Sequence, residues 1–475
     1  MSKKGPSEDG SFWLLFHVAG KRKAGGCMVI VRQSIYNPEK DVMAVNNGSI
    51  LSRYTGGYGA AVDIGTTTIA ASLFSLADKK YCGNITETNS QIKFGTDVMM
   101  RIMNAAMGKA ALLHGLVVNQ IEDMLLRSCR GICDKSQIVK MAVAGNTTMC
   151  HLFLGKDVSG MAGAPFKTAY SGSVDIKGRE IGFKEFPDMD IYVLPGVAAH
   201  IGADAVSVLC NQKLYNKEKI QLAADIGTNA EIILNNKGKI YACSAAAGPA
   251  FEGKGVKCGI RAGKGAINSI KISKSTGNIV LGVIGSLIPE GICGSGLVDA
   301  IAEFLKAGIL RPDGYLMDCG EALQNKVHKD IAERLCKSAE GNYFVLYNKQ
   351  HEIVVTQKDI RNIQLAKAAI QAAAEVLLET AGISLNDVDE VKIAGVFGKF
   401  IHPKSAVLFG LYPDIDNGNI EFVGNAAGNG AAQALLDSSY RELALRYSKE
   451  ARHIELAGEE IFQNKFLNAM ELKKW

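Results

Sequence analysis

The sequence has few of the features that mark membrane, secreted or nucleic-acid-binding proteins. No apolar run reaches the roughly 18 residues that a membrane helix needs. The short apolar stretch at 11–20 lacks a clean cleavage site, so we expect a strand or docking segment there rather than a signal peptide. The net charge of +5 over 475 residues comes without the clustered basic stripe that is typical of nucleic-acid binding. These absences favour a cytoplasmic globular protein that binds neither membranes nor nucleic acid.

Cysteine is present, but it is not arranged as a metal or cluster site. The 11 cysteines are scattered, and the pair Cys129 and Cys133 has no second pair to complete a site. Only Cys27 precedes residue 58, and no cysteine follows Cys336. Four ligands at the spacing usual for iron–sulfur clusters cannot be assembled. We therefore expect no iron–sulfur cluster and reduced thiols throughout.

The length of the chain predicts more than one lobe. At 475 residues the chain is too long for one ordinary core, so two or three lobes are expected. Helical and strand patterns alternate along it, which indicates an α/β architecture. Helices are predicted over 96–111, 116–127, 294–307, 358–381 and 425–436, and strands over 139–144, 191–194 and 390–394. The tail from Ser438 predicts a charged helix, followed by an apolar segment around Phe462, Phe466 and Met470 that docks back.

Two distant segments share one pattern, in which a buried strand with an aspartate near its end is followed by a Gly-Thr turn and a second strand. The first covers 60–74 and contains Asp63, and the second covers 223–234 and contains Asp225. Each reads as a β-hairpin. Their separation is too long for a solenoid repeat, and suits two homologous lobes that each open with such a hairpin.

The residue types in these hairpins suit phosphate and metal binding. Glycine lets the backbone turn tightly and approach a ligand closely, and the following N–H groups form an anion-binding concavity. Carboxylates at the strand ends can hold Mg²⁺, which prefers a few carboxylates together with water and phosphate oxygens. One hairpin alone is a weak signal, whereas two in equivalent positions predict an Mg-ATP cleft between two lobes. The predicted metal ligands are Asp63 and Asp225, and the predicted phosphate-binding residues are Gly65, Thr66, Thr67, Thr68, Gly227, Thr228 and Asn229.

Two glycine-rich segments near the C-terminus extend the predicted site. The strand at 390–394 leads into Gly395, Val396, Phe397 and Gly398, a turn suited to lying beneath an adenine or ribose. The segment 422–432, with Gly424 and Asn425, predicts a tightly packed helix at a hinge or cleft wall. Neither a phosphate-binding P-loop nor a correctly placed dinucleotide fingerprint is present.

Taken together, these motifs resemble those of the superfamily of acetate kinase, sugar kinases, heat-shock chaperones and actin. Further strings narrow the resemblance to the ATP-dependent reductive activators of corrinoid proteins. They lie at 89–98, 144–152, 194–204, 244–253, 291–297 and 357–361. The resemblance runs from Tyr58 to the C-terminus. It implies an α/β fold of two ribonuclease-H-like lobes with an ATP cleft between them, ATP and Mg²⁺ as cofactors, and a corrinoid protein partner of a methyltransferase system. A homodimer is a further expectation.

The resemblance also indicates a division of the chain. We expect an N-terminal appendage and linker at 1–57, a first lobe at 58–215 and a second lobe at 216–475. Activators of this kind usually carry an iron–sulfur domain, which the cysteine pattern does not provide. The expected activity is therefore ATP-driven reactivation of corrinoid cobalt from Co(II) to Co(I), with electrons from a separate donor. A small-molecule kinase with Glu252 or Asp204 as base, or a nucleotide-gated binding module, is an alternative.

The sequence allows two interpretations for each of several polar residues. Glu231 could orient a water molecule or be an exposed strand residue, and Glu252 could be a catalytic base or an outer-loop charge. Asn146 could contact the nucleotide or cap a helix. His200 is expected to be a satisfied histidine rather than a cobalt ligand, and the basic segment 254–264 a solvated hairpin rather than a partner surface.

Overall fold

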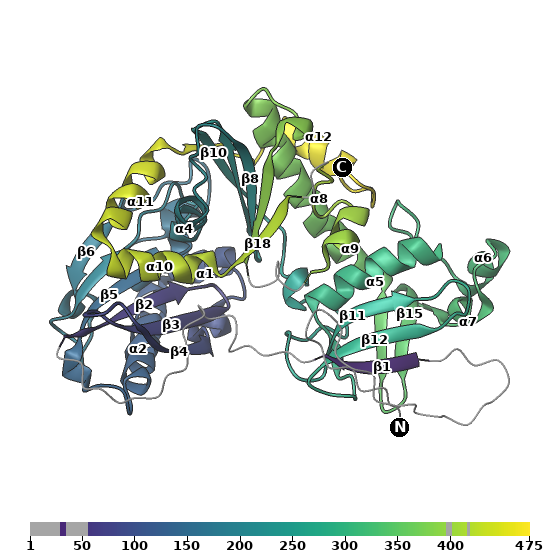
Figure 1. Ribbon diagram of the computed structural model, residues 1–475, viewed down its shortest axis with the longest axis horizontal. Coiled ribbons are helices and arrows are strands. Elements are labelled where there is room, and N and C mark those ends of the chain that lie inside the picture. The colour runs from purple at the N-terminus through teal and green to yellow at the C-terminus, as the bar shows by residue number, and fades with distance from the viewer. Residues whose placement is uncertain (1–28, 35–55, 396–400, 416–418) are drawn as a thin grey trace.

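Two six-stranded mixed sheets form the framework of the molecule (Figure 1). The computed structural model describes residues 29–34, 56–395, 401–415 and 419–475. The first sheet has the order β4-β3-β2-β5-β7-β6, and the second has the order β18-β17-β8-β9-β10-β19. The strands of the first sheet are β2 (Tyr58–Ile64), β3 (Thr68–Ser75), β4 (Tyr81–Thr88), β5 (Ile138–Gly145), β6 (Val174–Lys177) and β7 (Asp190–Val193). Those of the second are β8 (Ile220–Ile226), β9 (Ala230–Asn236), β10 (Lys239–Ala245), β17 (Glu390–Ala394), β18 (Ile420–Gly424) and β19 (Arg452–His453).

The two sheets present their aspartates in the same way. In the first sheet the antiparallel hairpin β2–β3 lies beside the parallel strand β5, and Asp63 is opposite Ala144. In the second sheet the hairpin β8–β9 lies beside the parallel strand β17, and Asp225 is opposite Ala394. The apolar residues of β2 and β8 are buried because each strand lies inside its sheet. The expected α/β fold with two Asp-bearing hairpins is confirmed.

A shared helical layer joins the two sheets. It consists of α4 (Ala203–Asn211), α10 (Ala426–Leu436) and α11 (Ser438–Glu450), whose buried residues form one core cluster with residues of both sheets. Helix α10 belongs to the second lobe by its position in the sequence, yet it packs against β2 and β5 of the first sheet and against α4. Small residues allow this close approach, since a Cβ atom on Gly430 would lie 2.0 Å from Ser207 Oγ. Chain order alone therefore does not assign this helix to a lobe.

Helices on the outer face of the first sheet lie directly behind the first hairpin. They are α1 (Val98–Asn104), α2 (Ala110–Ser128) and α3 (Thr147–Phe153), and they enclose a second core cluster. The continuous helix predicted over 96–111 is wrong in one respect, because a π-helical turn at Ala105–Lys109 separates α1 from α2. The turn forms at Gly108, whose φ of 87° favours glycine.

The rest of the second lobe surrounds the largest core cluster. Its main helices are α5 (Gly294–Ala307), α8 (Gln357–Thr380), α9 (Pro403–Leu408) and α12 (Glu460–Asn468), with the short α6 (Cys319–Gln324) and α7 (Lys329–Ala332). One small sheet has the order β1-β12-β11-β13, made of β1 (Val29–Ser34), β11 (Ala266–Ile272), β12 (Ile279–Ile284) and β13 (Gly291–Ile292). The other contains β14 (Leu335–Ser338), β15 (Gly341–Asn348) and β16 (Glu352–Thr356). Among the described residues, none of the helices combines the length and the apolar character needed to cross a lipid bilayer.

The sequence does not predict strand β1. Before Tyr58 it indicates a strand or docking segment only at 11–20, which lies outside the described residues. Strand β1 pairs in parallel with β12, with Val29 opposite Ile279. The apolar run is too short to distinguish a strand from a loop by pattern. Its partner strand lies some 250 residues away in the chain, and a pairing over such a separation forms only through tertiary contacts.

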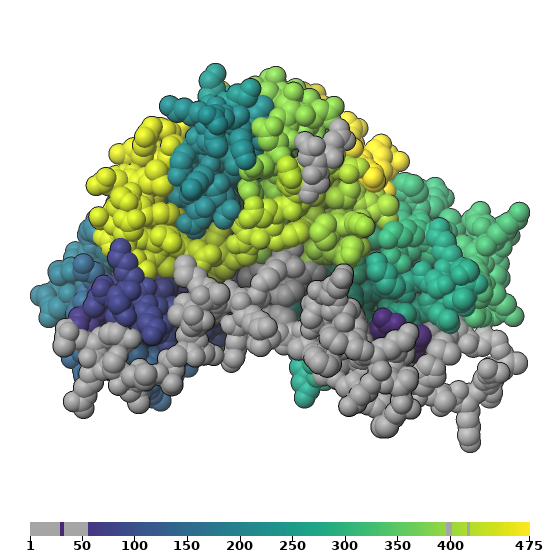
Figure 2. Space-filling view, viewed as in Figure 1, coloured from purple at the N-terminus to yellow at the C-terminus, as the bar shows by residue number. Residues whose placement is uncertain are grey.

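The C-terminal tail docks on the second lobe, as predicted. Phe462 and Phe466 of α12 pack against the core cluster of that lobe. The Lys367 ammonium of α8 donates to the carbonyls of Ala469 and Glu471, each at 2.8 Å. In Figure 2 the yellow C-terminal segments appear on both sides of the teal strands β8–β10, because α11 lies with the first sheet and α12 with the second lobe.

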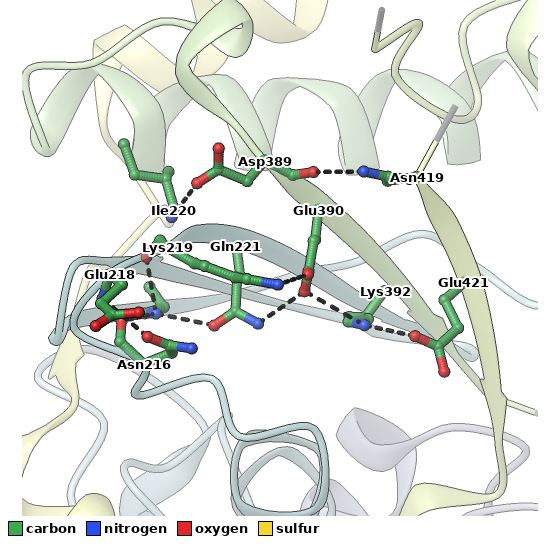
Figure 3. A network of polar contacts seen from close by, with 11 residues as sticks. Asn216, Glu218, Lys219, Ile220, Gln221, Asp389, Glu390, Lys392, Asn419 and Glu421 are labelled. Carbon is green, nitrogen blue, oxygen red and sulfur yellow. Dashed lines mark hydrogen bonds and ion pairs between the residues drawn. The ribbon is translucent and has the colours of Figure 1, made fainter. Parts of the chain in front are cut away.

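A polar network ties the starts of three parallel strands together, at the end of the second sheet opposite Asp225 (Figure 3). The carboxylate of Glu390 accepts a hydrogen bond from Gln221 Nε2 at 3.0 Å and pairs with Lys219 and Lys392. Lys392 also pairs with Glu421 at 2.5 Å. The hydrogen bond from Lys219 and the neighbouring lysine charge lower the pKa of Glu390 to about 2. The network links β8, β17 and β18 at the end of the sheet that lies opposite Asp225.

Candidate functional site

Both hairpins open into one cleft between the lobes. The cleft encloses about 1420 Å³ including the space open to solvent. Its walls come from elements that are far apart in sequence. The lining residues are Asp63, Gly65, Thr66, Thr67, Thr68, Thr86, Asn146, Asp204, Asp225, Ile226, Gly227, Thr228, Asn229, Glu231, Glu252, Arg261, Ala262, Gly395, Asn425, Ala426 and Ala427. The structure therefore brings together most of the residues that the sequence predicted separately.

The turn of the first hairpin exposes two backbone donors. Gly65 N–H donates to the Thr68 carbonyl at 3.0 Å and closes the turn. A side chain at this position would clash, because a Cβ atom would lie 2.6 Å from that same oxygen. The N–H groups of Thr66 and Thr67 have no acceptor among the described residues. Free amides beside a glycine turn form an anion-binding concavity.

The second hairpin repeats this arrangement. Gly227 N–H donates to the Asn229 carbonyl at 3.0 Å, and the Thr228 carbonyl accepts from Gly248 N–H at 2.8 Å. Within the described part of the chain, the amides of Thr228 and Asn229 likewise have no acceptor. The cleft therefore has unpaired donors on both walls, which suits a ligand with several anionic oxygens.

Glu252 spans the cleft and contacts both hairpins. One carboxylate oxygen accepts from Thr67 Oγ1 at 3.1 Å and the other from Thr228 Oγ1 at 2.8 Å. Lys254 lies alongside, with its Nζ 3.2 Å from Glu252 and 2.9 Å from Thr67 Oγ1. The interpretation of Glu252 as an outer-loop charge is therefore wrong. Because the carboxylate occupies hydroxyls that could bind phosphate, an anionic ligand that enters here has to compete with it.

Four carboxylates gather at the base of the cleft, and no lysine, arginine or histidine of the described residues forms an ion pair with them. Burial and repulsion from Asp204 raise the pKa of Asp63 and that of Asp225 to about 7, although a hydrogen bond from Asn425 partly counteracts this at Asp63. Burial raises the pKa of Asp204 to about 6, against backbone hydrogen bonds that lower it. Burial and repulsion from Asp204 and Asp225 raise the pKa of Glu231 well above its usual value. Such mutual repulsion is relieved when a cation binds.

The set of carboxylates fits a cation that keeps part of its water shell. Among the described residues, no three His, Cys, Asp or Glu side chains are placed to coordinate one metal ion directly. Zinc-type sites, which use three or four protein ligands, are therefore not supported. Mg²⁺ uses one or two carboxylates and completes its octahedron with water and phosphate oxygens, so Asp63 and Asp225 suit it.

Two asparagines link helix starts to the aspartate ends of the strands. Asn146 caps α3 by accepting from Met149 N–H at 3.0 Å, and it donates to Thr66 Oγ1 at 2.9 Å. The helix-capping interpretation of Asn146 is therefore correct. Asn146 also lines the cleft, and its contact with a nucleotide stays a prediction. Asn425 caps α10 by accepting from Gly428 N–H at 2.9 Å, and its side chain also hydrogen-bonds Asp63. The first turns of α3 and α10 thus face the cleft.

The predicted adenosine turn is described only in part. Gly395 lines the cleft with a φ of 92°, and a Cβ atom there would lie 2.7 Å from the Ile226 carbonyl. Its N–H donates to the carbonyl of Gly424 at 3.1 Å. Val396, Phe397 and Gly398 lie outside the described residues. The predicted nucleoside contact of this turn stays a prediction.

Three cleft residues were missed or given a different role by the sequence interpretation. The sequence suggests Asp204 only as a kinase base, whereas in the structure it lies within the group of cleft carboxylates. Lys254 and Arg261 belong to the segment expected to be a solvated hairpin, but both face the cleft, and Arg261 Nη1 lies 3.3 Å from Thr88 Oγ1 of the first lobe. No local pattern separates such residues from surface charges. Conservation of these positions among related sequences is the signal that could identify them as cleft residues.

The surroundings of the remaining candidates distinguish between their interpretations. His200 packs edge-on against Phe166, with ring centroids 4.9 Å apart, and burial lowers its pKa. Glu231 is buried in β9 and accepts from Ser244 Oγ at 3.3 Å, so it is not an exposed strand glutamate. The cysteines of the described ranges are all free thiols.

Family comparisons match both halves of this architecture. Residues 58–217 match the family described as "RACo middle region", and residues 219–475 match "C-terminal domain of RACo the ASKHA domain". Among solved structures, "Reductive activator for corrinoid,iron-sulfur protein" is 34% identical with a TM-score of 0.79, over 89% of this chain and 67% of that one.

Two named proteins are similar over most of their length. The "Corrinoid activation enzyme RamQ" of Eubacterium limosum is 33% identical over 421 residues, which cover 86% of this chain and 69% of the relative. The "[Co(II) methylated amine-specific corrinoid protein] reductase" of Methanosarcina barkeri is 26% identical over 449 residues, which cover 88% and 77%. The resemblance seen in the sequence motifs is confirmed.

Proposed function

The chain belongs to the RACo family, and we propose that it is a reductive activator that returns the cobalt of a corrinoid protein from Co(II) to Co(I). We further propose that ATP and Mg²⁺ bind in the cleft between the two hairpins and drive this reaction. A separate one-electron donor protein supplies the electron. In each cycle the donor is oxidised by one electron, Co(II) is reduced to Co(I), and water converts ATP to ADP and phosphate.

One observation carries the ATP assignment. Unpaired amides on both walls face the same cleft as a group of carboxylates that no cationic side chain of the described residues neutralises. Phosphate oxygens fit the amides, and Mg²⁺ fits the carboxylates. A magnesium-bound nucleoside triphosphate provides both the anionic oxygens for the amides and the cation for the carboxylates.

The turns of the two hairpins and the ends of their first strands have separate proposed roles. The amides and hydroxyls of Thr66, Thr67 and Thr228 bind phosphate oxygens, and Asp63 and Asp225 hold Mg²⁺ directly or through water. The bound ion supplies charge neutralisation for the phosphates. Glu231 and Glu252 are the candidates for orienting the attacking water.

Cleft closure is the proposed link to the partner. The lobes meet through the layer of α4, α10 and α11, so a ligand that bridges both hairpins biases their relative position. A ligand shifts such an equilibrium only by its differential affinity for the two states. The protein would therefore bind the Co(II) form of its partner selectively and release it after hydrolysis.

The test combines cobalt spectroscopy with ATP hydrolysis. The full chain is mixed with a methyltransferase corrinoid protein in the Co(II) form, a chemical one-electron reductant, Mg²⁺ and ATP. We expect ATP to accelerate the appearance of Co(I), and the Co(II) partner to stimulate hydrolysis. Asp225→Asn should abolish both effects, whereas Asp175→Asn on the exposed surface of β6 should abolish neither.

Two outcomes would overturn the proposal. Equal rates of Co(I) formation with and without ATP would remove the energetic role of the nucleotide. Transfer of phosphate to a small hydroxylated molecule would instead identify the chain as a kinase.

A further inference from the structure

A fully buried arginine lies directly behind the first hairpin. Arg101 of α1 is 0% exposed. Its guanidinium donates to the carbonyl of Thr66, to the carbonyl of Gly95 at 3.1 Å and to Gln91 Oε1 at 3.1 Å. Neither the motif pattern nor the proposed chemistry requires this residue.

Together with Asn89, Arg101 holds three consecutive carbonyls of the hairpin. Asn89 Nδ2 donates to the Gly65 carbonyl and Asn89 N–H donates to the Thr67 carbonyl, each at 2.9 Å. Arg101 holds the carbonyl of Thr66 between them. Asn89 and Arg101 are both fully buried and neither lines the cleft, so all three carbonyls point to the rear of the hairpin.

The direction of the carbonyls fixes the direction of the amides. In a planar trans peptide the C=O of one residue and the N–H of the next point opposite ways. The carbonyls of Gly65 and Thr66 point to the rear, so the N–H groups of Thr66 and Thr67 point toward the cleft. These are the two amides that have no acceptor among the described residues. The anion-binding concavity is therefore set before a ligand arrives.

Asn89 and Arg101 together form a clamp on the three carbonyls, and Arg101 also places a positive charge behind the proposed phosphate site. Burial lowers the pKa of Arg101 to about 10, so the guanidinium stays protonated at neutral pH. The hydrogen-bond partners of its guanidinium are all neutral groups, and among the described residues the one charge that raises its pKa is that of Asp97. A buried charge is costly unless something compensates it. The equivalent carbonyl of the second hairpin, on Thr228, is held by a neutral backbone amide instead.

We propose that Arg101 is a positioning residue for the phosphates of the bound nucleotide: it turns the Thr66 and Thr67 amides into the cleft and adds a cationic field behind them. This inference rests on the proposed function, since it assumes that the anion in the cleft is a nucleotide. It assigns the phosphate preference of the first hairpin to a side chain that never touches the ligand.

The experiment compares ligands that differ in phosphate number. Affinities of the full chain for ATP, ADP, adenosine and inorganic tripolyphosphate are measured by calorimetry for the wild type, Arg101→Met and Arg101→Lys. We expect Arg101→Met to weaken the affinity for ATP and for tripolyphosphate by about 10- to 100-fold. This is the range expected when charge-assisted hydrogen bonds are lost. Adenosine affinity should stay unchanged. Arg101→Lys should lie in between, because it keeps the charge but not the fork of donors.

The outcomes separate this inference from the proposed function. If wild type binds ATP and Arg101→Met binds it equally well, the inference on Arg101 is overturned while the nucleotide site stands. Equal weakening of ATP and adenosine would show a purely structural role and also overturn it. If wild type binds neither ATP nor tripolyphosphate, the proposed function itself fails.

Further variants serve as a control and as substitutes in case Arg101→Met does not fold. Arg127→Met removes an exposed arginine of α2 that pairs with Glu87, and it should leave all four affinities unchanged. If Arg101→Met does not fold, Arg101→Lys and Asn89→Ala provide the same comparison, because each removes part of the carbonyl clamp. Unchanged tripolyphosphate affinity in both would overturn the inference.

Discussion

The aspartates of the cleft illustrate what single residues contribute. Their pKa values lie between about 6 and 7 in the folded protein, well above the ordinary value of 3.8. A carboxyl whose pKa is raised on folding stabilises the fold below its unfolded pKa, and this contribution is lost as the pH rises through the folded pKa. The charged forms are thus a cost to the metal-free protein, and we infer that a bound cation offsets it.

Removing Asp204 should make the metal-free protein more stable at high pH. In the presence of a chelator, the melting temperature of the wild type should fall as the pH rises from about 4 to 7, over the window between unfolded and folded pKa values. Asp204→Asn should flatten this fall, because Asp204 is the neighbour that repels both Asp63 and Asp225. Thermal unfolding at pH 5 and pH 8 provides the measurement. A variant whose pH dependence equals that of wild type would rule out this repulsion.

Glu252→Gln should separate nucleotide binding from hydrolysis. The amide keeps one oxygen that can accept from Thr67 or Thr228, but it cannot take a proton from water. We expect kcat for ATP hydrolysis to fall by about 100-fold or more, the usual contribution of a general base. The ATP affinity should change by only a few-fold, and equilibrium binding and steady-state kinetics measure the two effects. Unchanged kcat would exclude Glu252 as the base.

At the scale of elements, the docking of the C-terminal tail depends on a buried lysine. Lys367 of α8 is 1% exposed and holds two carbonyls of the tail. Burial lowers its pKa to about 8. Since this is below the unfolded value, the free energy of unfolding should rise as the pH increases from about 8 to 10.5.

Lys367→Met should loosen the tail and remove that rise. The variant leaves the carbonyls of Ala469 and Glu471 without their donor, which costs about 1–3 kcal/mol. Urea unfolding at pH 8 and pH 10 measures the stability, and protease cleavage of the C-terminus measures the docking. Lys465→Met, which removes a more exposed pair with Glu379 on the same two helices, should have a much smaller effect. Equal effects of the two substitutions would contradict a special role of Lys367.

Elements also differ in how far the sequence specifies them. The hairpins at Asp63 and Asp225 are predictable because strand, glycine turn and strand follow within a few residues. The π-helical turn before α2 was missed, since a single glycine such as Gly108 is tolerated in many helices. Strand β1 was missed because its pairing partner, β12, is distant in the chain.

On the scale of the whole molecule, the layer between the sheets determines how the lobes communicate. Helix α10 carries Asn425 at its start, and its flank packs against α4 through Gly430. The same helix therefore contacts Asp63 in the cleft and forms part of the joint between the lobes. We infer that closure over a nucleotide and movement of α10 are coupled.

Gly430→Ala should disturb this joint. The new Cβ atom would meet Ser207 Oγ at 2.0 Å, and such overpacking costs about 1–3 kcal/mol. We expect a lower melting temperature and a weaker stimulation of ATP hydrolysis by the Co(II) corrinoid protein. Gly115→Ala in α2 is the matched control, because it has open space around the new atom and should stabilise the protein slightly. If both variants behaved alike, steric contact at α10 would not be the cause.

The sequence by itself determined the α/β class, the two Asp-bearing hairpins, the docking of the tail and the resemblance to corrinoid activators. All of these depend on residues that lie close together in the chain. Only the tertiary structure placed Glu252 across both hairpins, Asp204 among the carboxylates and Arg101 behind the first hairpin. These side chains acquire their surroundings from segments that are distant in sequence, and the burial and electric field they experience exist only once those segments have packed.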